Sequence, residues 1–285
     1  MKVKEIMNSP VLALKPIDTI AHAKNLMLRH KVKRLIVMDK GKLSGILTMH
    51  DLAVRLRMES PTWRMRTIDN IPVSRVMSKG VLSISLGTDV SKAAMMMLDR
   101  GISSLVVADG EEISGILTKT DLVRYFSESL TNRFKVRDLM SKDLVTVNRL
   151  HSIARVVELM EEYGVRRVVV TEGDKPVGLI TESDVAFAQL DLPDKGARER
   201  KVRYTRKIER GGRPRARYIK YVALLTADDV MQKELITIDA ESDVAQAASL
   251  MIKNGISGIP VVEGEKLVGI LTKTDITKGV RRLGV

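Results

Sequence analysis

The chain has 285 residues, of which 44% are hydrophobic and 29% charged, and its formal net charge is +13. This balance is typical of a globular chain that can bury a core, and no apolar run approaches the roughly 18 residues that a membrane span needs. Cysteine is absent, which excludes disulfides and thiolate chemistry, and the opening MKVKEIMNSP lacks the apolar stretch of a signal peptide. We therefore expect a soluble, cytoplasmic protein with no membrane contact.

The positive charge is concentrated in one segment. Between Lys195 and Tyr221 there are twelve Lys and Arg residues against two Glu, a net charge of +10, whereas the remaining residues carry 36 basic and 33 acidic side chains, a net charge of only +3. The body of the chain is therefore nearly neutral, and the basic segment needs a separate explanation.

Four copies of one pattern follow each other along the chain. Each copy has a Met, a Gly 38 residues after it and an Asp 44 residues after it, and the Gly and Asp delimit a motif G-h-h-T-x-x-D in which h is apolar. Four copies without an insertion or deletion in this window indicate a repeated structural unit. The motifs are GILTMHD at 45–51, GILTKTD at 115–121, GLITESD at 178–184 and GILTKTD at 269–275.

Each copy predicts the element order β-α-β-β-α. In copy 1 a short apolar stretch, VLAL, is followed by the helix-capping residue Thr19, a helix, the strands RLIVMD and SGILT, and a second helix that begins near HDLAVRL. A residue suited to a left-handed conformation ends the first helix of three copies, and Lys31 is the exception in copy 1. The equivalent caps are Asp89, Ser152 and Asp243, and the helix-ending glycines are Gly101, Gly164 and Gly255.

This order, with its Met opening and its G-h-h-T-x-x-D close, resembles the CBS domain, which pairs in tandem into Bateman modules. The resemblance implies an α/β fold of four tandem β-α-β-β-α CBS repeats paired into two Bateman modules, similar in layout to the gamma regulatory subunit of AMP-activated kinase. We expect repeat 1 at 1–57, repeat 2 at 72–127, repeat 3 at 135–190, a basic insertion at 191–225 and repeat 4 at 226–285. Both a monomeric disk and a homodimer fit this layout.

The motif has two interpretations. Thr-x-x-Asp at a helix start is close to a capping box, and helix capping alone accounts for the pattern. The same atoms suit a nucleotide, because a helix N-terminus attracts phosphate through unpaired N–H groups and a carboxylate accepts hydrogen bonds from a ribose diol. In CBS-type sites the matching Thr and Asp contact phosphate and ribose, so the resemblance favours a ligand. The residues are Thr48 and Asp51, Thr118 and Asp121, Thr181 and Asp184, and Thr272 and Asp275.

Basic pairs precede the second strand in alternate copies. Copy 1 has Lys33 and Arg34 and copy 3 has Arg166 and Arg167, whereas copies 2 and 4 have Ser-Ser and Ser-Gly there. Charges beside a strand are commonly solvated, but this pair is similar to the phosphate-contacting pair of the kinase gamma subunit. We expect phosphorylated ligands against copies 1 and 3. Copies 2 and 4 would bind more weakly or accept S-adenosylmethionine, and AMP, ADP or ATP is the expectation that the family supplies.

Residues 198–221 alternate in character around Gly211 and Gly212, which predicts a β-hairpin with one strongly basic face. A charge run is usually a solvated face, but this one also suits nucleic acid, an acidic protein or a nucleotide phosphate. The candidate nucleic-acid contacts are Arg203, Arg206, Lys207, Arg213, Arg215 and Arg217.

The sequence contains neither of the common phosphate-binding glycine loops, no acid/base pair over a pocket and no metal-ligand set. We therefore expect a non-catalytic regulatory protein that binds adenosine-type nucleotides in clefts between paired CBS repeats, and signals to an unknown effector protein by a conformational shift, as in energy sensing. One alternative is a nucleic-acid-binding regulator that uses 198–221, with the repeats as a ligand-gated scaffold. A second is a structural adaptor whose clefts are empty.

Overall fold

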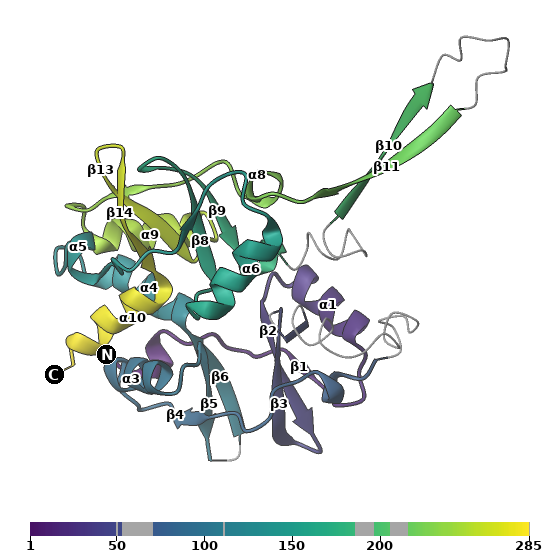
Figure 1. The fold of residues 1–285 in the computed structure, drawn as a ribbon. Coiled ribbons are helices and arrows are strands. Elements are labelled where there is room, and N and C mark those ends of the chain that lie inside the picture. The colour runs from purple at the N-terminus through teal and green to yellow at the C-terminus, as the bar shows by residue number, and fades with distance from the viewer. Residues whose placement is uncertain (50, 53–70, 111, 186–196, 206–215, 285) are drawn as a thin grey trace, which may run out of the picture. The chain divides into compact units, whose positions relative to one another are not determined.

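The computed structural model describes residues 1–284 except 50, 53–70, 111, 186–196 and 206–215, and for 197–205 and 216–224 it describes the backbone alone. The chain divides into two units, which are described separately: Met1–Lys142 with Ile236–Val285, and Asp143–Leu235. Figure 1 shows helices and strands alternating along both units. No helix in the described part of the chain is long and apolar enough to cross a membrane.

Each copy forms its own three-stranded sheet, in which the first strand pairs parallel with the second and the second antiparallel with the third. The predicted β-α-β-β-α order is confirmed in full for copies 2 and 4, and for copies 1 and 3 as far as the first residues of the closing helix, beyond which the chain is not described. Copy 1 has β1 (Ala13–Leu14), α1 (Ile20–Arg29), β2 (Arg34–Asp39) and β3 (Lys42–Thr48). Copy 2 has β4 (Ser83–Ser85), α3 (Val90–Asp99), β5 (Ser104–Asp109), β6 (Glu112–Thr118) and α4 (Lys119–Ser129). Copy 3 has β7 (Thr146–Val147), α6 (Ile153–Glu162), β8 (Arg167–Glu172) and β9 (Lys175–Thr181). Copy 4 has β12 (Ile238–Asp239), α9 (Val244–Lys253), β13 (Gly258–Glu263), β14 (Lys266–Thr272) and α10 (Lys273–Arg282).

The ends of the first helices agree with the sequence pattern. Thr19, Ser152 and Asp243 accept hydrogen bonds from backbone N–H groups of the first turn, whereas the N-cap Asp89 makes no such bond and its carboxylate pairs with Lys2. The helices end on residues with a positive φ, which glycine adopts without strain. These residues are Lys31 (53°), Gly101 (64°), Gly164 (60°) and Gly255 (65°).

The segment that opens each copy packs on the neighbouring copy instead of on its own. In the first unit, the segment with η1 (Val3–Glu5) pairs with copy 2 through Asn8 N–H and Ile116 O (2.9 Å), and the segment with η4 (Val73–Arg75) pairs with copy 1 through Ser78 N–H and Ile46 O (2.9 Å). The sequence does not predict this exchange.

Copies 3 and 4 trade their opening segments in the same way. In the first unit, the segment with α5 (Val136–Leu139) pairs with copy 4, and Ser141 N–H donates to Ile270 O (2.9 Å). In the second unit, the segment with α8 (Ala227–Val230) pairs with copy 3, and Gln232 N–H donates to Leu179 O (2.9 Å). The exchange therefore links the copies in two pairs, 1 with 2 and 3 with 4.

The repeated Met and Gly meet in this exchange. A Cβ atom at Gly115 would lie 2.6 Å from the Met7 sulfur and 2.8 Å from the Asn8 carbonyl oxygen, and Gly45 has the same relation to Met77. Because these separations are shorter than real Cβ contacts, only glycine fits beneath the docked segment. Gly269 lies against Met140 and Gly178 against Met231 in the same manner.

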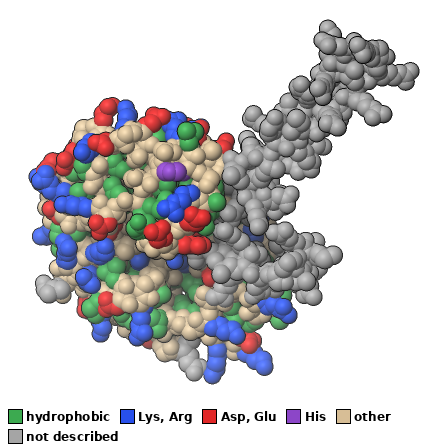
Figure 2. All heavy atoms as spheres, viewed as in Figure 1, with side chains coloured by type: hydrophobic (Ala, Val, Ile, Leu, Met, Phe, Trp, Pro, Cys, Tyr) green, Lys and Arg blue, Asp and Glu red, His purple; other side chains and the backbone are tan. Residues whose placement is uncertain are grey.

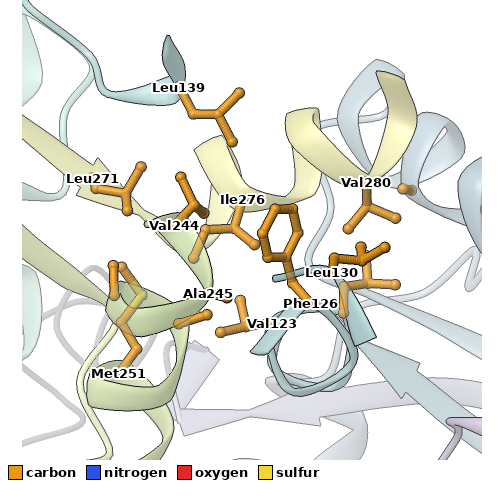
Figure 3. Close-up of a cluster of buried hydrophobic side chains, with 14 of the residues drawn as sticks. Val123, Phe126, Leu130, Leu139, Val244, Ala245, Met251, Leu271, Ile276 and Val280 are labelled. Carbon is orange, nitrogen blue, oxygen red and sulfur yellow. The ribbon is translucent and has the colours of Figure 1, made fainter. Parts of the chain in front are cut away.

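Copies 2 and 4 share one hydrophobic core in the first unit. Figure 3 shows Phe126 of α4 beside Ile276 of α10, and both side chains are fully buried. A Cβ at Gly279 of α10 would lie 2.7 Å from Leu139 Cδ1 and 3.2 Å from the Phe126 ring, so the missing side chain lets α10 pack closely against both residues. Copy 1 and copy 3 each have a separate buried cluster.

The basic insertion contains the predicted hairpin. β10 (Ala197–Thr205) pairs antiparallel with β11 (Ala216–Leu224), and Lys201 lies opposite Lys220 while Arg200 lies opposite Tyr221. Because successive strand positions alternate between faces, this register gives cationic positions to both faces. The prediction of a single basic face is therefore wrong. Over the described surface in Figure 2, basic and acidic side chains are interspersed, as expected of a nearly neutral body.

We expect Gly115→Ala to lower the free energy of unfolding by about 1–3 kcal/mol, because the added methyl meets the backbone carbonyl of Asn8, which cannot move away as a side chain would. Urea unfolding followed by circular dichroism measures this loss. The matched control is Gly87→Ala, where nothing lies within 4 Å of the new Cβ. Equal stability of both variants would contradict the docking role of the glycine.

Candidate functional site

The Thr and Asp of each motif form the predicted capping box where the last strand passes into a helix. In copy 2, Asp121 Oδ2 accepts hydrogen bonds from the Thr118 N–H (2.8 Å) and the Thr118 hydroxyl (2.7 Å). The same two bonds, at 2.6–2.9 Å, join Thr48 to Asp51, Thr181 to Asp184, and Thr272 to Asp275. One carboxylate oxygen in each copy is thus committed to the helix start.

Capping by itself does not indicate a ligand site, because the same geometry occurs outside the motif. At the start of α8, Asp229 Oδ2 accepts from the Thr226 N–H (3.0 Å) and hydroxyl (2.8 Å), and Asp229 is exposed. In the motif the carboxylates are more enclosed: Asp121 and Asp275 are 2% exposed and Asp51 is 7% exposed, while Asp184 is half-buried. The burial of the carboxylate, and not the capping geometry, distinguishes the motif from the cap at Asp229.

A polar side chain from the exchanged segment contacts the other carboxylate oxygen. Asn8 Nδ2 donates to Asp121 Oδ1 at 2.7 Å, and this Asn directly follows the Met that docks on copy 2. The equivalent contacts to Oδ1 are Ser78 with Asp51 (3.1 Å), Ser141 with Asp275 (3.2 Å) and Gln232 with Asp184 (3.1 Å). Sequence reasoning missed these four residues, although their position one residue after the spaced Met was a usable signal.

The N–H groups at the helix start of copy 2 are engaged within the protein. Thr118 N–H bonds to Asp121, Lys119 N–H donates to Ser103 O (3.1 Å), and Thr120 N–H donates to the Thr118 hydroxyl oxygen (3.2 Å). The expectation of unpaired N–H groups that await a phosphate is therefore wrong for this copy. Binding of an anion at this position would therefore depend on cationic side chains and not on these N–H groups.

The basic pairs lie beside these helix starts. Met49 N–H donates to Lys33 O (3.1 Å) and Glu182 N–H donates to Arg166 O (3.1 Å), so each pair adjoins the first residue after its motif Thr. Lys33 and Arg166 are exposed, and Arg166 lies 3.9 Å from a Glu182 carboxylate oxygen.

Copy 1 reaches copy 2 through its basic pair. Arg34 Nη2 donates to Ser103 Oγ of copy 2 at 2.7 Å. One residue of the basic pair of copy 1 therefore contacts one residue of the neutral Ser pair of copy 2 directly. Arg167 begins β8 in copy 3.

The two identical motifs meet each other. Lys119 Nζ donates to Thr274 Oγ1 (3.1 Å) and Lys273 Nζ donates to Thr120 Oγ1 (2.9 Å), so the Lys-Thr pair of each GILTKTD contacts that of the other copy. Copies 1 and 3 have Met-His and Glu-Ser at these two positions. A reciprocal contact between copies 2 and 4 therefore accounts for their letter-for-letter identity.

Ion pairs hold two exchanged segments at their edges. A hydrogen bond and the positive charge of Lys2 hold the pKa of Asp89 below its ordinary value, and Lys233 with Arg149 does the same to the pKa of Asp228. Each ion pair therefore stabilises the folded chain at neutral pH, and this stabilisation is lost as the pH falls through the lowered pKa of the Asp.

Four of the six candidate nucleic-acid residues, Arg206, Lys207, Arg213 and Arg215, lie outside the described residues. Arg203 is in β10 opposite Tyr218, and Arg217 is in β11 opposite Tyr204. Within the described part of the chain, no three His, Asp or Glu side chains lie close enough together to hold a metal ion.

Comparison with known proteins assigns the family. The CBS-domain family model matches residues 3–57, 73–128, 136–191 and 227–282, which is most of the chain. The chain therefore belongs to the CBS-domain family, with four CBS repeats.

Two relatives from Methanocaldococcus jannaschii resemble it over nearly its whole length. Uncharacterized protein MJ1404 is 29% identical over 99% of this chain, which spans 62% of that relative's length. Uncharacterized protein MJ1225 is 23% identical over 97% of both chains.

Two solved structures have the same overall fold. That of MJ1225, described as a candidate archaeal homologue of g-AMPK, superposes with a TM-score of 0.74 at 19% identity, covering 98% of this chain and 99% of that one. That of an uncharacterized conserved protein from Pyrococcus horikoshii has a TM-score of 0.67 at 18% identity and covers 98% of this chain and 100% of that one. At these identities the likeness establishes the fold alone.

We expect Thr118→Ala to lower the free energy of unfolding by about 1 kcal/mol, because the hydroxyl and its bonds to Asp121 and Thr120 are lost. Thr118→Ser keeps the hydroxyl and should retain most of the stability in chemical denaturation. If Ser lost as much stability as Ala, the capping role of the hydroxyl would be contradicted.

Proposed function

We propose that this chain is a non-catalytic regulatory protein that binds adenosine-type nucleotides in clefts of its paired CBS repeats and signals to a protein partner. One observation carries the proposal. In each copy a carboxylate has one oxygen fixed by the motif Thr and its other oxygen against a polar side chain from the neighbouring copy. Each candidate site is thus assembled from two copies.

The geometry supports a division of roles among the residues of the proposed site. Because Oδ2 is committed to the helix cap, Oδ1 is the atom that would accept a ribose hydroxyl, and the cap fixes its position. The phosphate would be bound by the cationic pairs, Lys33 with Arg34 and Arg166 with Arg167. Charge-assisted hydrogen bonds of this kind contribute about 1.5–3 kcal/mol each, a useful share of the roughly 8 kcal/mol behind micromolar binding. The adenine preference, whether AMP, ADP, ATP or S-adenosylmethionine, comes from the family and not from these contacts.

The exchanged segments supply a route for signalling. A ligand at Asp121 meets Asn8, whose neighbour Met7 anchors the opening segment of copy 1 on copy 2. Occupancy would therefore bias how the two copies are joined, and with them the surface shown to an effector protein. A ligand shifts such an equilibrium only by the difference in its affinity for the two arrangements.

Calorimetric titration with AMP, ADP, ATP and S-adenosylmethionine tests the proposal. We expect micromolar binding of at least one, weakened about tenfold by Asp51→Asn or Asp184→Asn, because an amide cannot replace a carboxylate toward a diol. The matched control is Asp229→Asn, which alters the same capping geometry outside the motif and should leave binding unchanged. If none of the four ligands produces heat on titration, the nucleotide proposal is contradicted and helix capping alone accounts for the motifs.

The hairpin register supports a second candidate function, nucleic-acid binding. Lys201 lies directly opposite Lys220, and like charges in such a pair are destabilising unless an anion lies near them. A two-stranded ribbon also fits a duplex major groove. The repeats would then be a ligand-gated scaffold for the 198–221 ribbon.

Fluorescence anisotropy with a labelled DNA duplex at several salt concentrations tests this candidate. If six phosphates are neutralised, log affinity should fall against log salt with a slope near about −5. Deletion of 198–221 should abolish duplex binding and leave nucleotide affinity unchanged. Binding that ignores salt, or that survives the deletion, would contradict the candidate.

A further inference from the structure

Outside the basic insertion, the positive charge of the chain lies in copy 1. Residues 1–72 carry 14 Lys and Arg against six Asp and Glu, a net charge of +8, whereas residues 73–134, 135–194 and 222–285 have net charges of 0, −3 and −2. A surface with such an excess of one sign attracts partners of the opposite sign. Copy 1 is therefore the part of the first unit in which a surface for an acidic partner is expected.

A cavity of about 610 Å³ lies at one end of the copy 1 sheet, between the turn that follows β1 and the turn that joins β2 to β3. Its lining includes the aliphatic side chain of Ile17 and two cations, Lys15 and Lys40, and Asp39 is the one acidic residue in the lining. The motif Thr48 lies at the opposite end of β3, about 20 Å away at the usual rise of a strand. The cavity is therefore separate from the candidate nucleotide site.

Copy 1 differs in charge from the other copies at this end of the sheet. Lys15 and residues 39–42 contain three Lys and one Asp, a net charge of +2, whereas the equivalent positions of copies 2, 3 and 4 have net charges of −3, −1 and −2. Lys15, Lys40 and Lys42 are exposed, and none of their side chains pairs with an acidic residue in the part of the chain that the structure describes. The equivalent positions are Ser85 and 109–112, Asn148 and 172–175, and Asp239 and 263–266.

The backbone at Lys40 suits glycine better than lysine. Its φ is 48°, and the other three copies have a glycine there, with φ of 58–63° at Gly110, Gly173 and Gly264. A side chain at a positive φ strains the backbone, and strained residues cluster at functional sites. The conformation of Lys40 is thus a second observation, independent of the charge count, that points to a use for its ammonium group.

Ile17 lies on a turn that the exchanged segment holds. Its side chain is 78% exposed, while the carbonyl oxygens of Pro16 and Asp18 accept hydrogen bonds from backbone N–H groups of the η4 segment at 2.9 and 2.7 Å. The same segment contacts the motif carboxylate of Asp51 through Ser78 (3.1 Å). A partner that covers Ile17 would therefore contact the joint between copies 1 and 2, whose arrangement a nucleotide is proposed to bias.

We propose that this end of copy 1 is a docking surface for the effector protein, and that it binds an acidic segment of that protein. An apolar side chain of the segment lies beside Ile17 in the cavity, and its carboxylates contact Lys15, Lys40 and Lys42. An exposed aliphatic residue alone is ordinary, but an apolar centre with a charged rim is the usual composition of a protein interface. A phosphate backbone would contact the lysines and leave the aliphatic lining uncovered, so a protein segment fits better than nucleic acid. The inference rests on the proposed function in that the partner is its effector.

Selection of a display library of random peptides on the full chain, without nucleotide, tests the surface. We expect the enriched peptides to be acidic and to carry an apolar residue. In fluorescence anisotropy with an enriched, labelled peptide, Ile17→Ser should weaken binding about tenfold, the loss expected for one buried aliphatic side chain. Lys40→Gly should weaken it about threefold, as for a charge at the rim of an interface, without lowering the melting temperature, because glycine relieves the backbone strain.

Two matched controls accompany these variants. Leu150 is the equivalent of Ile17 in copy 3 and is 83% exposed, but its turn lacks both lysines. Leu150→Ser should leave peptide binding unchanged. Lys31→Gly removes the other lysine of copy 1 with a positive φ (53°), at the far end of β2, and should also leave peptide binding unchanged.

The docking surface is overturned if the library yields no binder, if the enriched peptides lack acidic residues, or if Leu150→Ser weakens binding as much as Ile17→Ser. If labelled duplex DNA binds, no peptide does, and Lys40→Gly abolishes the DNA binding, the surface belongs to nucleic acid and the proposal is wrong. Because the selection contains no nucleotide, its failure leaves the nucleotide proposal standing, and failure of the nucleotide titration leaves a peptide-binding surface standing.

Discussion

The contact between each repeated Met and the Gly of the neighbouring copy is the constraint on which the rest of the structure depends. At Gly115 and Gly45 the carbonyl oxygen of the residue after the docked Met lies 2.8 Å from where a Cβ would stand. The opening segment can therefore dock only on a residue without a side chain. Docking has two consequences. It joins the copies in pairs, and it brings the residue after each Met to a carboxylate. Packing and the candidate site therefore have one origin.

The two carboxylate oxygens of each motif aspartate have different partners. Oδ2 completes a helix cap that recurs at Thr226 and Asp229, where no motif is present. Oδ1 faces the neighbouring copy's segment and, in copies 2 and 4, a cation of its own helix. This division explains why the helix-cap and ligand interpretations do not exclude each other: a stable cap holds the second oxygen where a ligand can meet it.

Local patterns in the sequence predicted the elements well, because caps, helix-ending residues and strand alternation act over a few residues. The exchange of segments was not predictable from spacing. Each Met stands 38 residues before its own Gly, and this spacing within a copy does not show that the Met docks on the Gly of its partner copy instead.

The remaining errors depend on partners distant in sequence or on register. Ser103 O occupies an N–H group that was expected to be unpaired. The register that pairs Tyr204 with Arg217 gives cationic positions to both faces of the hairpin, which the alternation within one strand does not show. The contact of Lys119 with Thr274 gives the two identical motifs a structural reason that no single copy reveals.

A crystal structure of the protein grown with AMP tests the central claim most directly. The account predicts the ribose hydroxyls within about 3.2 Å of Oδ1 of Asp51 or Asp184, with the phosphate toward Lys33 and Arg34 or toward Arg166 and Arg167. AMP bound elsewhere, with every motif carboxylate contacting only protein, would contradict it.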